Sequence, residues 1–190
     1  MNLPPLILAS ASPRRSELLR QLRLKFQVFV ADAEEILPEH LTPHEICQIN
    51  AYRKARVVAK KFPDALVLGA DTIVCLGTQV FGKPADRFAA HRMLMALQGK
   101  QHEVVTGICL IHLRGHRQRI FAVATDVKFH PLTDAQISAY LNQVNPLDKA
   151  GAYAIQEHGH LIVESIEGSF SNVVGLPIER VREELAEWRE

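Results

Sequence analysis

An unbroken apolar run is the feature that most constrains how this chain can fold. Residues 65–70 read Ala-Leu-Val-Leu-Gly-Ala, and Asp71 follows them. A strand that is covered on both faces reads as such a continuous run, whereas a half-exposed strand alternates apolar and polar residues. We therefore expect a sheet with helices on both faces, and we expect Asp71 at the carboxyl end of this strand.

Capping residues and apolar periodicity predict the elements around that strand. Thr42 and Glu45 form one capping box, Thr133 and Gln136 form another, and Asp86 can cap a third helix. The alternation of helices and strands predicts a single α/β domain over residues 1–190, with a mixed sheet, flanking helices and a central cleft. The expected strands are 6–9, 65–70, the hairpin 73–76 with 79–81, 104–113, 120–129 and 161–165, and the expected helices are 13–22, 43–61, 87–98, 134–143 and one from Pro177 onward.

The charge balance and the cysteine spacing exclude several classes of protein. Lys and Arg number 22 and Asp and Glu number 21, so a net charge of +1 gives no basic field for a nucleic acid. No apolar run approaches the ~20 residues of a membrane span, and the first residues lack the pattern of a signal peptide. Three scattered cysteines argue against a disulfide framework and a zinc site. We therefore expect a cytoplasmic protein that binds neither nucleic acid nor membrane.

The turn at residues 10–15, Ser-Ala-Ser-Pro-Arg-Arg, has the composition of a phosphate site. Ser12 and Pro13 predict the start of a helix, whose free N–H groups and dipole attract anions. Arg14 and Arg15 add two guanidinium groups that match phosphate oxygens. The residues alone leave a second interpretation equally open, in which Ser12 only caps the helix and both arginines are solvated.

Two acidic positions are candidates for holding a divalent cation. Asp71 is expected at the end of a strand, where ligands bind in open α/β sheets, although a turn aspartate that bonds its own backbone is the alternative. Burial of the strand favours the functional interpretation. Glu34 and Glu35 precede the second expected helix and offer another carboxylate, although adjacent acids are more often a solvated surface.

Two lysines are further candidates for binding phosphate. Residues 77–84 nearly spell a P-loop, but Pro84 stands where Ser or Thr would bind magnesium, so we reject that motif. Lys83 is kept as a candidate, because Gly82 and Pro84 fix it at a rigid turn. Lys54 lies in the second expected helix, where a solvated surface position is the more common case.

Residues 148–156, Asp-Lys-Ala-Gly-Ala-Tyr-Ala-Ile-Gln, are poor in bulky side chains. Small residues let a planar ligand or another backbone approach closely, and the amide of Gln156 can both donate to and accept from the edge of a base. A tight structural turn explains the small residues as well.

Together these blocks resemble the Maf family of nucleoside triphosphate pyrophosphatases. The resemblance runs in order along almost the whole chain. It implies hydrolysis of a nucleoside triphosphate to the monophosphate and pyrophosphate with a divalent metal cation, Mg²⁺ or Mn²⁺. It also implies an elongated α/β fold similar to that of the inosine triphosphate pyrophosphatases, with a homodimer as one possible assembly. The matching blocks are residues 8–15, 54–55, 69–72, 82–84, 148–156 and 168–177.

Within the family, the combination of Ser-Pro-Arg-Arg, Ala-Asp-Thr and Asp-Lys-Ala-Gly-Ala-Tyr resembles the branch that acts on dTTP and UTP. The resemblance implies that Asp71 is the catalytic residue and that Arg14, Thr72 and Gln156 select the base. The implied triphosphate-binding residues are Ser10, Arg15, Lys54 and Lys83, and the implied metal ligands are Asp71 and Glu34, with Glu35 as the alternative to Glu34.

Two other functions compete with this one. A 7-methyl-GTP pyrophosphatase would belong to the sister branch, and a nucleotide-binding regulator of cell division would bind without turnover. Asp71 among cations favours catalysis, because binding an anion would not need a carboxylate that faces it. The chain also departs from the family at Glu157 and His158, where glycine often follows the glutamine, and at Phe170, where tyrosine is frequent. The first departure could reshape the rim of the base pocket.

Overall fold

The computed structural model describes residues 3–188, which form two compact units. The first unit takes the chain up to Asp71, Thr106–Val123 and the chain from Gly175 onward, and the second takes Thr72–Val105 and Ala124–Val174. Three long strands contribute residues to both units. They are β3 (Leu66–Leu76), β5 (Gln101–His112) and β6 (Arg117–Phe129).

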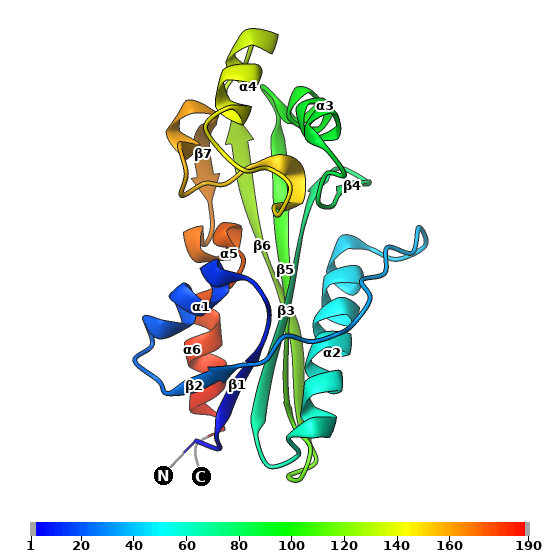
Figure 1. The fold of residues 1–190 in the computed structure, drawn as a ribbon, viewed down its shortest axis with the longest axis vertical. Helices are drawn as coiled ribbons and strands as arrows, with labels where there is room; N and C mark the ends of the chain where they lie inside the picture. Colours follow the sequence, from blue (N-terminus) through cyan, green and yellow to red (C-terminus); the bar gives the residue numbers. More distant parts are fainter. Residues whose placement is uncertain (1–2, 189–190) are drawn as a thin grey trace. The chain divides into compact units, whose positions relative to one another are not determined.

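The first unit is a sheet covered by helices on both faces. In Figure 1, α2 lies on one side of its strands, and α1 and α6 lie on the other. Leu66 and Leu68 are fully buried, as expected of a strand covered on both faces. The further elements of this unit are β1 (Leu6–Ala9), β2 (Phe26–Val28), α1 (Pro13–Arg20), α2 (Pro43–Lys61) and α6 (Ile178–Ala186).

At two points the backbone of helix α2 lies directly against the backbone of the sheet, with no side chain between them. A Cβ atom at Gly69 of β3 would stand 2.8 Å from the nitrogen of Ala55, and one at Gly107 of β5 would stand 2.6 Å from the nitrogen of Gln48. No side chain fits at these distances, so both positions require glycine. This contact sets how deep the side chains of α2 reach toward the sheet.

The second unit is built around a core of large apolar side chains. Leu94 and Leu97 of α3, Ile137 and Tyr140 of α4 and Phe129 of β6 belong to it. Its further elements are β4 (Gln79–Phe81), α3 (Arg87–Leu97), α4 (Asp134–Leu141), β7 (Val163–Glu167) and α5 (Phe170–Val174), with 3₁₀ turns at Ala150–Ala152 and Gly159–Leu161.

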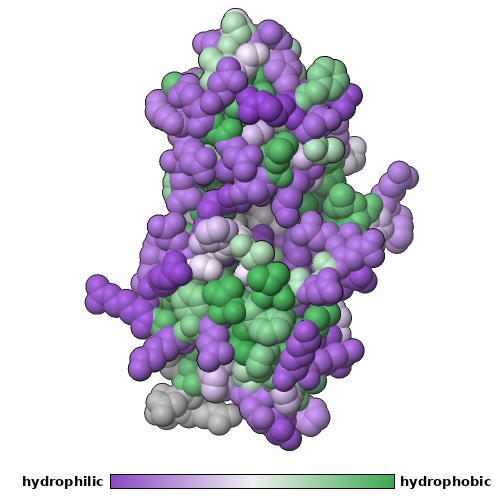
Figure 2. All heavy atoms as spheres, viewed as in Figure 1, coloured by the Kyte–Doolittle hydropathy of each residue, from purple (hydrophilic) through white to green (hydrophobic). Residues whose placement is uncertain are grey.

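The strands form a mixed seven-stranded sheet in the order β2-β1-β3-β5-β6-β7, with β4 paired to β3. Strand β1 is parallel to β2 and β3, whereas β4 is antiparallel to β3 and β7 is antiparallel to β6. The expected mixed sheet with flanking helices is confirmed. The first unit carries hydrophobic surface in the view of Figure 2. Among its described residues, the exposed large apolar ones are Val28, Val30 and Leu37.

The predicted helix starts agree with the structure, with one difference in detail. Thr42 accepts from the nitrogen of Glu45 in the first capping box, and Asp86 accepts from the nitrogen of Ala89. The second box, at Thr133, is also present. Ser12 occupies the N-cap position of α1, but its side chain makes no capping hydrogen bond. Across residues 3–188, none of the helices is long and apolar enough to cross a membrane.

The expectation that a strand ends before Asp71 is wrong, because β3 continues without a break to Leu76. The strand changes partner there instead. Its pairing with β1 ends at Gly69, which is opposite Ala9, and its pairing with β4 begins at Val74. Asp71 thus lies inside a strand but beyond the carboxyl end of the neighbouring β1.

Three smaller differences concern short elements. Strand β2 and helix α5 were not expected, and they have three and five residues, which is too short for a periodic pattern. The strand expected near Leu161 begins at Val163, since Gly159–Leu161 forms a 3₁₀ turn.

Candidate active site

Asp71 is a buried carboxylate that two side chains of α2 hold from different sides. Only 4% of the residue is exposed. Its Oδ1 lies 2.6 Å from Nζ of Lys54, and its Oδ2 accepts a hydrogen bond from Nδ2 of Asn50 at 3.2 Å. The interpretation as a turn aspartate is therefore wrong, because the residue lies in a strand and its carboxylate has partners on a helix.

Lys54 bridges two carboxylates. Its Nζ lies 2.6 Å from Oδ1 of Asp71 and 2.7 Å from Oε1 of Glu35. The lysine side chain is 13% exposed, so the solvated surface position is wrong. Because one ammonium contacts both carboxylates, their oxygens converge on one point. We call Asp71, Lys54, Glu35 and Asn50 the Asp71 cluster.

The glutamate in this cluster is Glu35 rather than Glu34. Backbone contacts on either side of it hold the segment: Nε of Arg53 donates to the carbonyl oxygen of Glu34 at 3.2 Å, and both backbone groups of Ile36 bond to the amide of Asn50. Both glutamates are exposed, so the contact of Glu35 with Lys54, and not burial, separates the two. The structure thus brings Glu35, and not Glu34, to the cluster, and the metal role given to Glu34 stays a prediction.

Asn50 is the cluster residue that the sequence analysis missed. It is 1% exposed, and it holds both the carboxylate of Asp71 and the backbone of Ile36. It precedes Lys54 by four residues, which places both on one face of α2. The available signal was an amide among apolar helix positions, next to Ala51.

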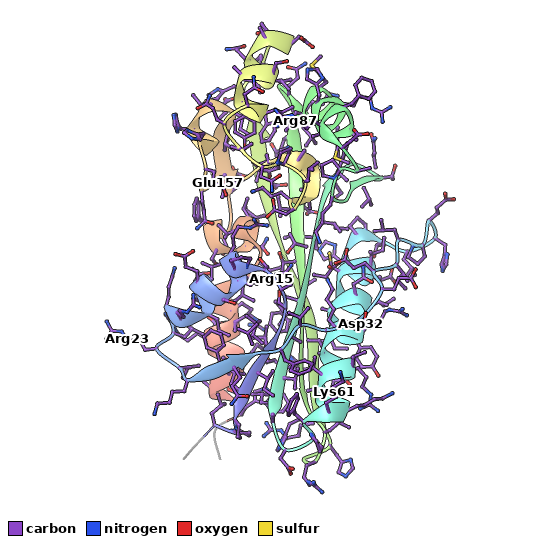
Figure 3. The ribbon with its side chains drawn as sticks, in the orientation of Figure 1. Arg15, Arg23, Asp32, Lys61, Arg87 and Glu157 are labelled. Atoms are coloured by element: carbon purple, nitrogen blue, oxygen red, sulfur yellow. The ribbon has the colours of Figure 1, made fainter. Side chains whose placement is uncertain are left out.

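Arg15 is anchored next to the cluster by backbone oxygens from two other segments. Its Nε donates to the carbonyl oxygen of Gly175 at 2.8 Å, and its Nη1 donates to that of Ala70 at 2.9 Å. The same Nη1 lies 3.4 Å from Oγ of Ser10. Figure 3 labels this side chain, which extends from α1. The structure thus brings Arg15 and Ser10 together, and the solvated interpretation is wrong for Arg15.

The electrostatics keep Arg15 positively charged. Burial lowers the pKa of its guanidinium, while the negative charges of Asp71 and Glu35 oppose that shift, and the neighbouring Arg14 adds to the lowering. An arginine keeps its proton under such conditions. Two cations, Arg15 and Lys54, therefore stand beside the two carboxylates.

Of the other predicted site residues, Arg14 lies on α1 of the first unit and is partly buried, and the remaining three lie in the second unit. Thr72 follows Asp71 along β3 and is partly buried, whereas Lys83 and Gln156 are exposed. The carbonyl oxygen of Gly82 accepts from the nitrogen of Gly151 at 3.1 Å. This bond brings the turn that carries Lys83 next to the segment that precedes Gln156.

The small residues of that segment serve packing at two positions. Gly151 has a φ of +68°, and a Cβ atom there would stand 2.9 Å from Cγ2 of Val74. Ala152 follows with a φ of 65° and is fully buried. The tight structural turn therefore explains Gly151 and Ala152, while Gln156 lies beyond it and is exposed.

The comparisons with known proteins agree on one family. The model of the family described as Maf-like protein matches residues 5–188. The dTTP/UTP pyrophosphatase of Acetivibrio thermocellus is 46% identical over an alignment of 190 positions, which covers 96% of this chain and 94% of that protein. Those of Carboxydothermus hydrogenoformans and Symbiobacterium thermophilum are 43% and 45% identical, over 95% and 96% of this chain and 97% and 93% of theirs. The match over nearly the whole length confirms the resemblance of the blocks, and the chain belongs to the Maf family.

Proposed function

We propose that this chain is a nucleoside triphosphate pyrophosphatase that hydrolyses dTTP and UTP to the monophosphate and pyrophosphate. The observation that carries the proposal is the buried carboxylate of Asp71, held by Lys54 and Asn50 with the guanidinium of Arg15 beside it. Relatives named dTTP/UTP pyrophosphatase support the choice of substrates.

Cations of the chain would bind the triphosphate. In the first unit Arg15 and Lys54 supply positive charge and Ser10 a hydroxyl, and in the second unit Lys83 is exposed after β4. Positioned cations stabilise the charge that moves to the leaving phosphates during phosphoryl transfer. Arginine held by two backbone oxygens is pre-oriented, so little of its freedom is lost when an anion binds.

Asp71 would act on the attacking water. A bond forms between the water oxygen and the α-phosphorus, and the bond from that phosphorus to the bridging oxygen of the β-phosphate breaks. The water proton passes to the carboxylate of Asp71, and pyrophosphate leaves with the electron pair of the broken bond. Asn50 and Lys54 hold the two oxygens of this carboxylate, so its orientation is fixed before the water arrives.

The donor set fits a hard divalent cation. Within residues 3–188, no group of three or more His, Cys, Asp or Glu side chains could hold a metal ion. Mg²⁺ commonly binds through one or two carboxylates together with waters and substrate phosphates. Asp71 and Glu35, whose oxygens Lys54 contacts in this structure, offer two carboxylates. These two residues would hold Mg²⁺ or Mn²⁺, which would neutralise triphosphate charge. The sequence analysis named Glu34 for this role, with Glu35 as its alternative.

Residues of the second unit would select the base. The hydroxyl of Thr72 and the amide of Gln156 can present a donor and an acceptor to O4 and N3 of uracil or thymine, and Arg14 of the first unit is the third residue that the family associates with this choice. Cytosine exchanges the acceptor and the donor at these two atoms. We therefore expect the highest kcat/KM for UTP and dTTP, a lower value for CTP, and the lowest values for ATP and GTP.

A panel of triphosphates tests the proposal. The purified protein is incubated with Mg²⁺ and each of UTP, dTTP, CTP, ATP, GTP and 7-methyl-GTP, and the products are separated by ion exchange. Monophosphate and pyrophosphate from UTP and dTTP support it. A diphosphate and single phosphates would show that the wrong bond breaks. A higher kcat/KM for 7-methyl-GTP than for UTP would move the chain to the sister branch, and binding without products would favour the regulator.

The compartment and the assembly stay predictions. Burial raises the pKa of the thiols of Cys75 and Cys109 to about 12, so both are unreactive. The expected reducing cytoplasm rests on the scattered cysteines of the sequence. A homodimer would be recognised by its mass in light scattering.

A further inference from the structure

We propose that the ion pair between Lys149 and Glu157 positions the amide of Gln156 and thereby sets how strongly the enzyme prefers UTP over CTP. This inference rests on the proposed function, because it takes Gln156 as the residue that contacts the base. Neither member of the pair is among the residues assigned above to catalysis, phosphate or metal.

Lys149 is a buried cation whose ammonium group donates two hydrogen bonds and has a third oxygen, of Glu157, within ion-pair distance. The residue is only 5% exposed. Its Nζ donates to the carbonyl oxygen of Asn145 at 2.7 Å and to Oδ1 of Asp148 at 3.0 Å. The third oxygen is Oε1 of Glu157 at 3.5 Å. A buried ammonium needs such partners, because burying an uncompensated charge is strongly unfavourable.

Glu157 reaches back to this cation from the residue that follows Gln156. Its side chain is 47% exposed, whereas that of Lys149 is 5% exposed, so the pair joins a fixed interior group to a surface segment. Figure 3 labels Glu157 in this segment. Because Gln156 is bonded directly to Glu157, a restraint on the glutamate side chain also restrains the backbone that carries the amide.

Other contacts hold the segment on both sides of Gln156, including the carbonyl oxygen of His158, which accepts from the nitrogen of Leu161 at 3.0 Å. The hydroxyl of Tyr140 accepts from the nitrogen of Ala154 at 3.0 Å and donates to its carbonyl oxygen at 3.3 Å. The buried hydroxyl of Tyr153 lies 3.0 Å from Nε2 of His102. Beyond Ala154, residues 156–158 are exposed. The Lys149 contact is thus the side-chain restraint that acts nearest to Gln156.

A fixed amide discriminates between bases, whereas a mobile one does not. Uracil presents an acceptor at position 4 and a donor at N3, and cytosine presents the reverse. An amide that turns over can satisfy either pattern, because its oxygen accepts and its nitrogen donates. Loosening residue 156 should therefore weaken the preference for UTP more than it slows the chemistry at phosphorus.

The test compares Glu157→Gln with a matched control in the same unit. Glu157→Gln keeps the shape and removes the charge. Glu164→Gln makes the same change in the ion pair of Glu164 with Lys128, which measures 2.8 Å and lies on β7 and β6. Binding of non-hydrolysable α,β-methylene analogues of UTP and CTP is measured by calorimetry, beside kcat and KM for UTP and CTP and hydrogen exchange of residues 154–158.

Glu157→Gln should raise the KM for UTP about threefold to tenfold, leave kcat within about twofold, and lower the UTP to CTP ratio in binding and in kcat/KM by about the same factor. Amide hydrogen exchange in residues 154–158 should become faster in Glu157→Gln than in the wild-type protein. Glu157→Asp should restore part of the ratio, and Glu164→Gln should change none of these quantities.

The outcomes separate this inference from the proposed function. If Glu157→Gln keeps the wild-type binding ratio while UTP is hydrolysed normally, the inference is overturned and the proposed function stands. If the wild-type protein prefers the UTP analogue but releases no pyrophosphate, and Glu157→Gln loses that preference, the proposed function fails and the positioning role is supported. Equal binding of the two analogues by the wild-type protein would overturn the inference.

Discussion

Replacing Asp71 by asparagine should damage both turnover and stability, for reasons that can be worked out from its contacts. The substitution keeps the shape and removes the charge. One oxygen of Asp71 contacts Lys54 at 2.6 Å and the other accepts from Asn50 at 3.2 Å, so either orientation of the new amide points an NH₂ group at a donor. Asn50 cannot turn to compensate, because both ends of its own amide bond the backbone of Ile36.

The size of the stability loss follows from the burial of the pair. Removing one partner of a buried ion pair costs about 3–5 kcal/mol. Because Lys54 would keep its contact with Glu35, the lower end applies, and the mismatched amide adds about 1 kcal/mol. We expect a loss of about 4 kcal/mol, which lowers a urea midpoint by about 2 M at a slope near 2 kcal/mol per M. The loss in kcat should be at least ~10²-fold, the low end for a positioned proton acceptor.

The assay combines urea unfolding, followed by circular dichroism, with pyrophosphate release from UTP at a temperature where the variant is folded. Asp64→Asn is the matched control, since it makes the same change in the ion pair with Arg114, whose two side chains are 70% and 66% exposed. The control should keep the wild-type midpoint and kcat. A kcat for Asp71→Asn within tenfold of wild type would refute the role of this carboxylate in proton transfer. An unchanged midpoint would refute the energetic argument.

Three further predictions concern the metal, the phosphate and the pH. Chelation by EDTA should abolish turnover, and Mg²⁺ or Mn²⁺ should restore it without any need for zinc; full activity in excess EDTA would contradict this. Arg15→Ala and Lys83→Ala should each raise KM and lower kcat, because they bind phosphate in the ground and transition states; an effect on kcat alone would not fit. Arg15→Ala should also destabilise the fold, since Arg15 bonds two backbone oxygens. Burial lowers the pKa of His102 from 6.5 to about 4, so the unfolded chain binds the extra proton first as pH falls. The free energy of unfolding should therefore drop by about 3 kcal/mol between pH 6.5 and pH 4, and His102→Asn should flatten this slope in urea titrations.

Local signals in the sequence predicted local structure well. The capping boxes at Thr42 and Thr133 and the cap at Asp86 depend on residues three apart, so they could be recognised without knowing the fold. The resemblance of the blocks indicated the family for the same reason, because each block is contiguous. Helix starts and family membership could therefore be predicted from the sequence.

Features that depend on contacts between residues far apart in the sequence could not be predicted from it. The apolar run before Asp71 looked like a complete strand, because nothing local reveals that β3 exchanges β1 for β4 and continues. The choice between Glu34 and Glu35 depends on bonds from α2 to their segment. Asn50 escaped notice because its partner Asp71 is 21 residues away.

The glycines under α2 make the reactive carboxylate sensitive to a residue that carries no functional group. Alanine usually rigidifies a strand relative to glycine, so a stabilisation screen would favour it at Gly69. Here the added methyl would push against the backbone at Ala55 and lift the helix that carries Asn50 and Lys54. Misplacement by about 1 Å can cost about 10²-fold in rate. A variant at Gly69 would thus look like a core-packing mutant while behaving as an active-site one.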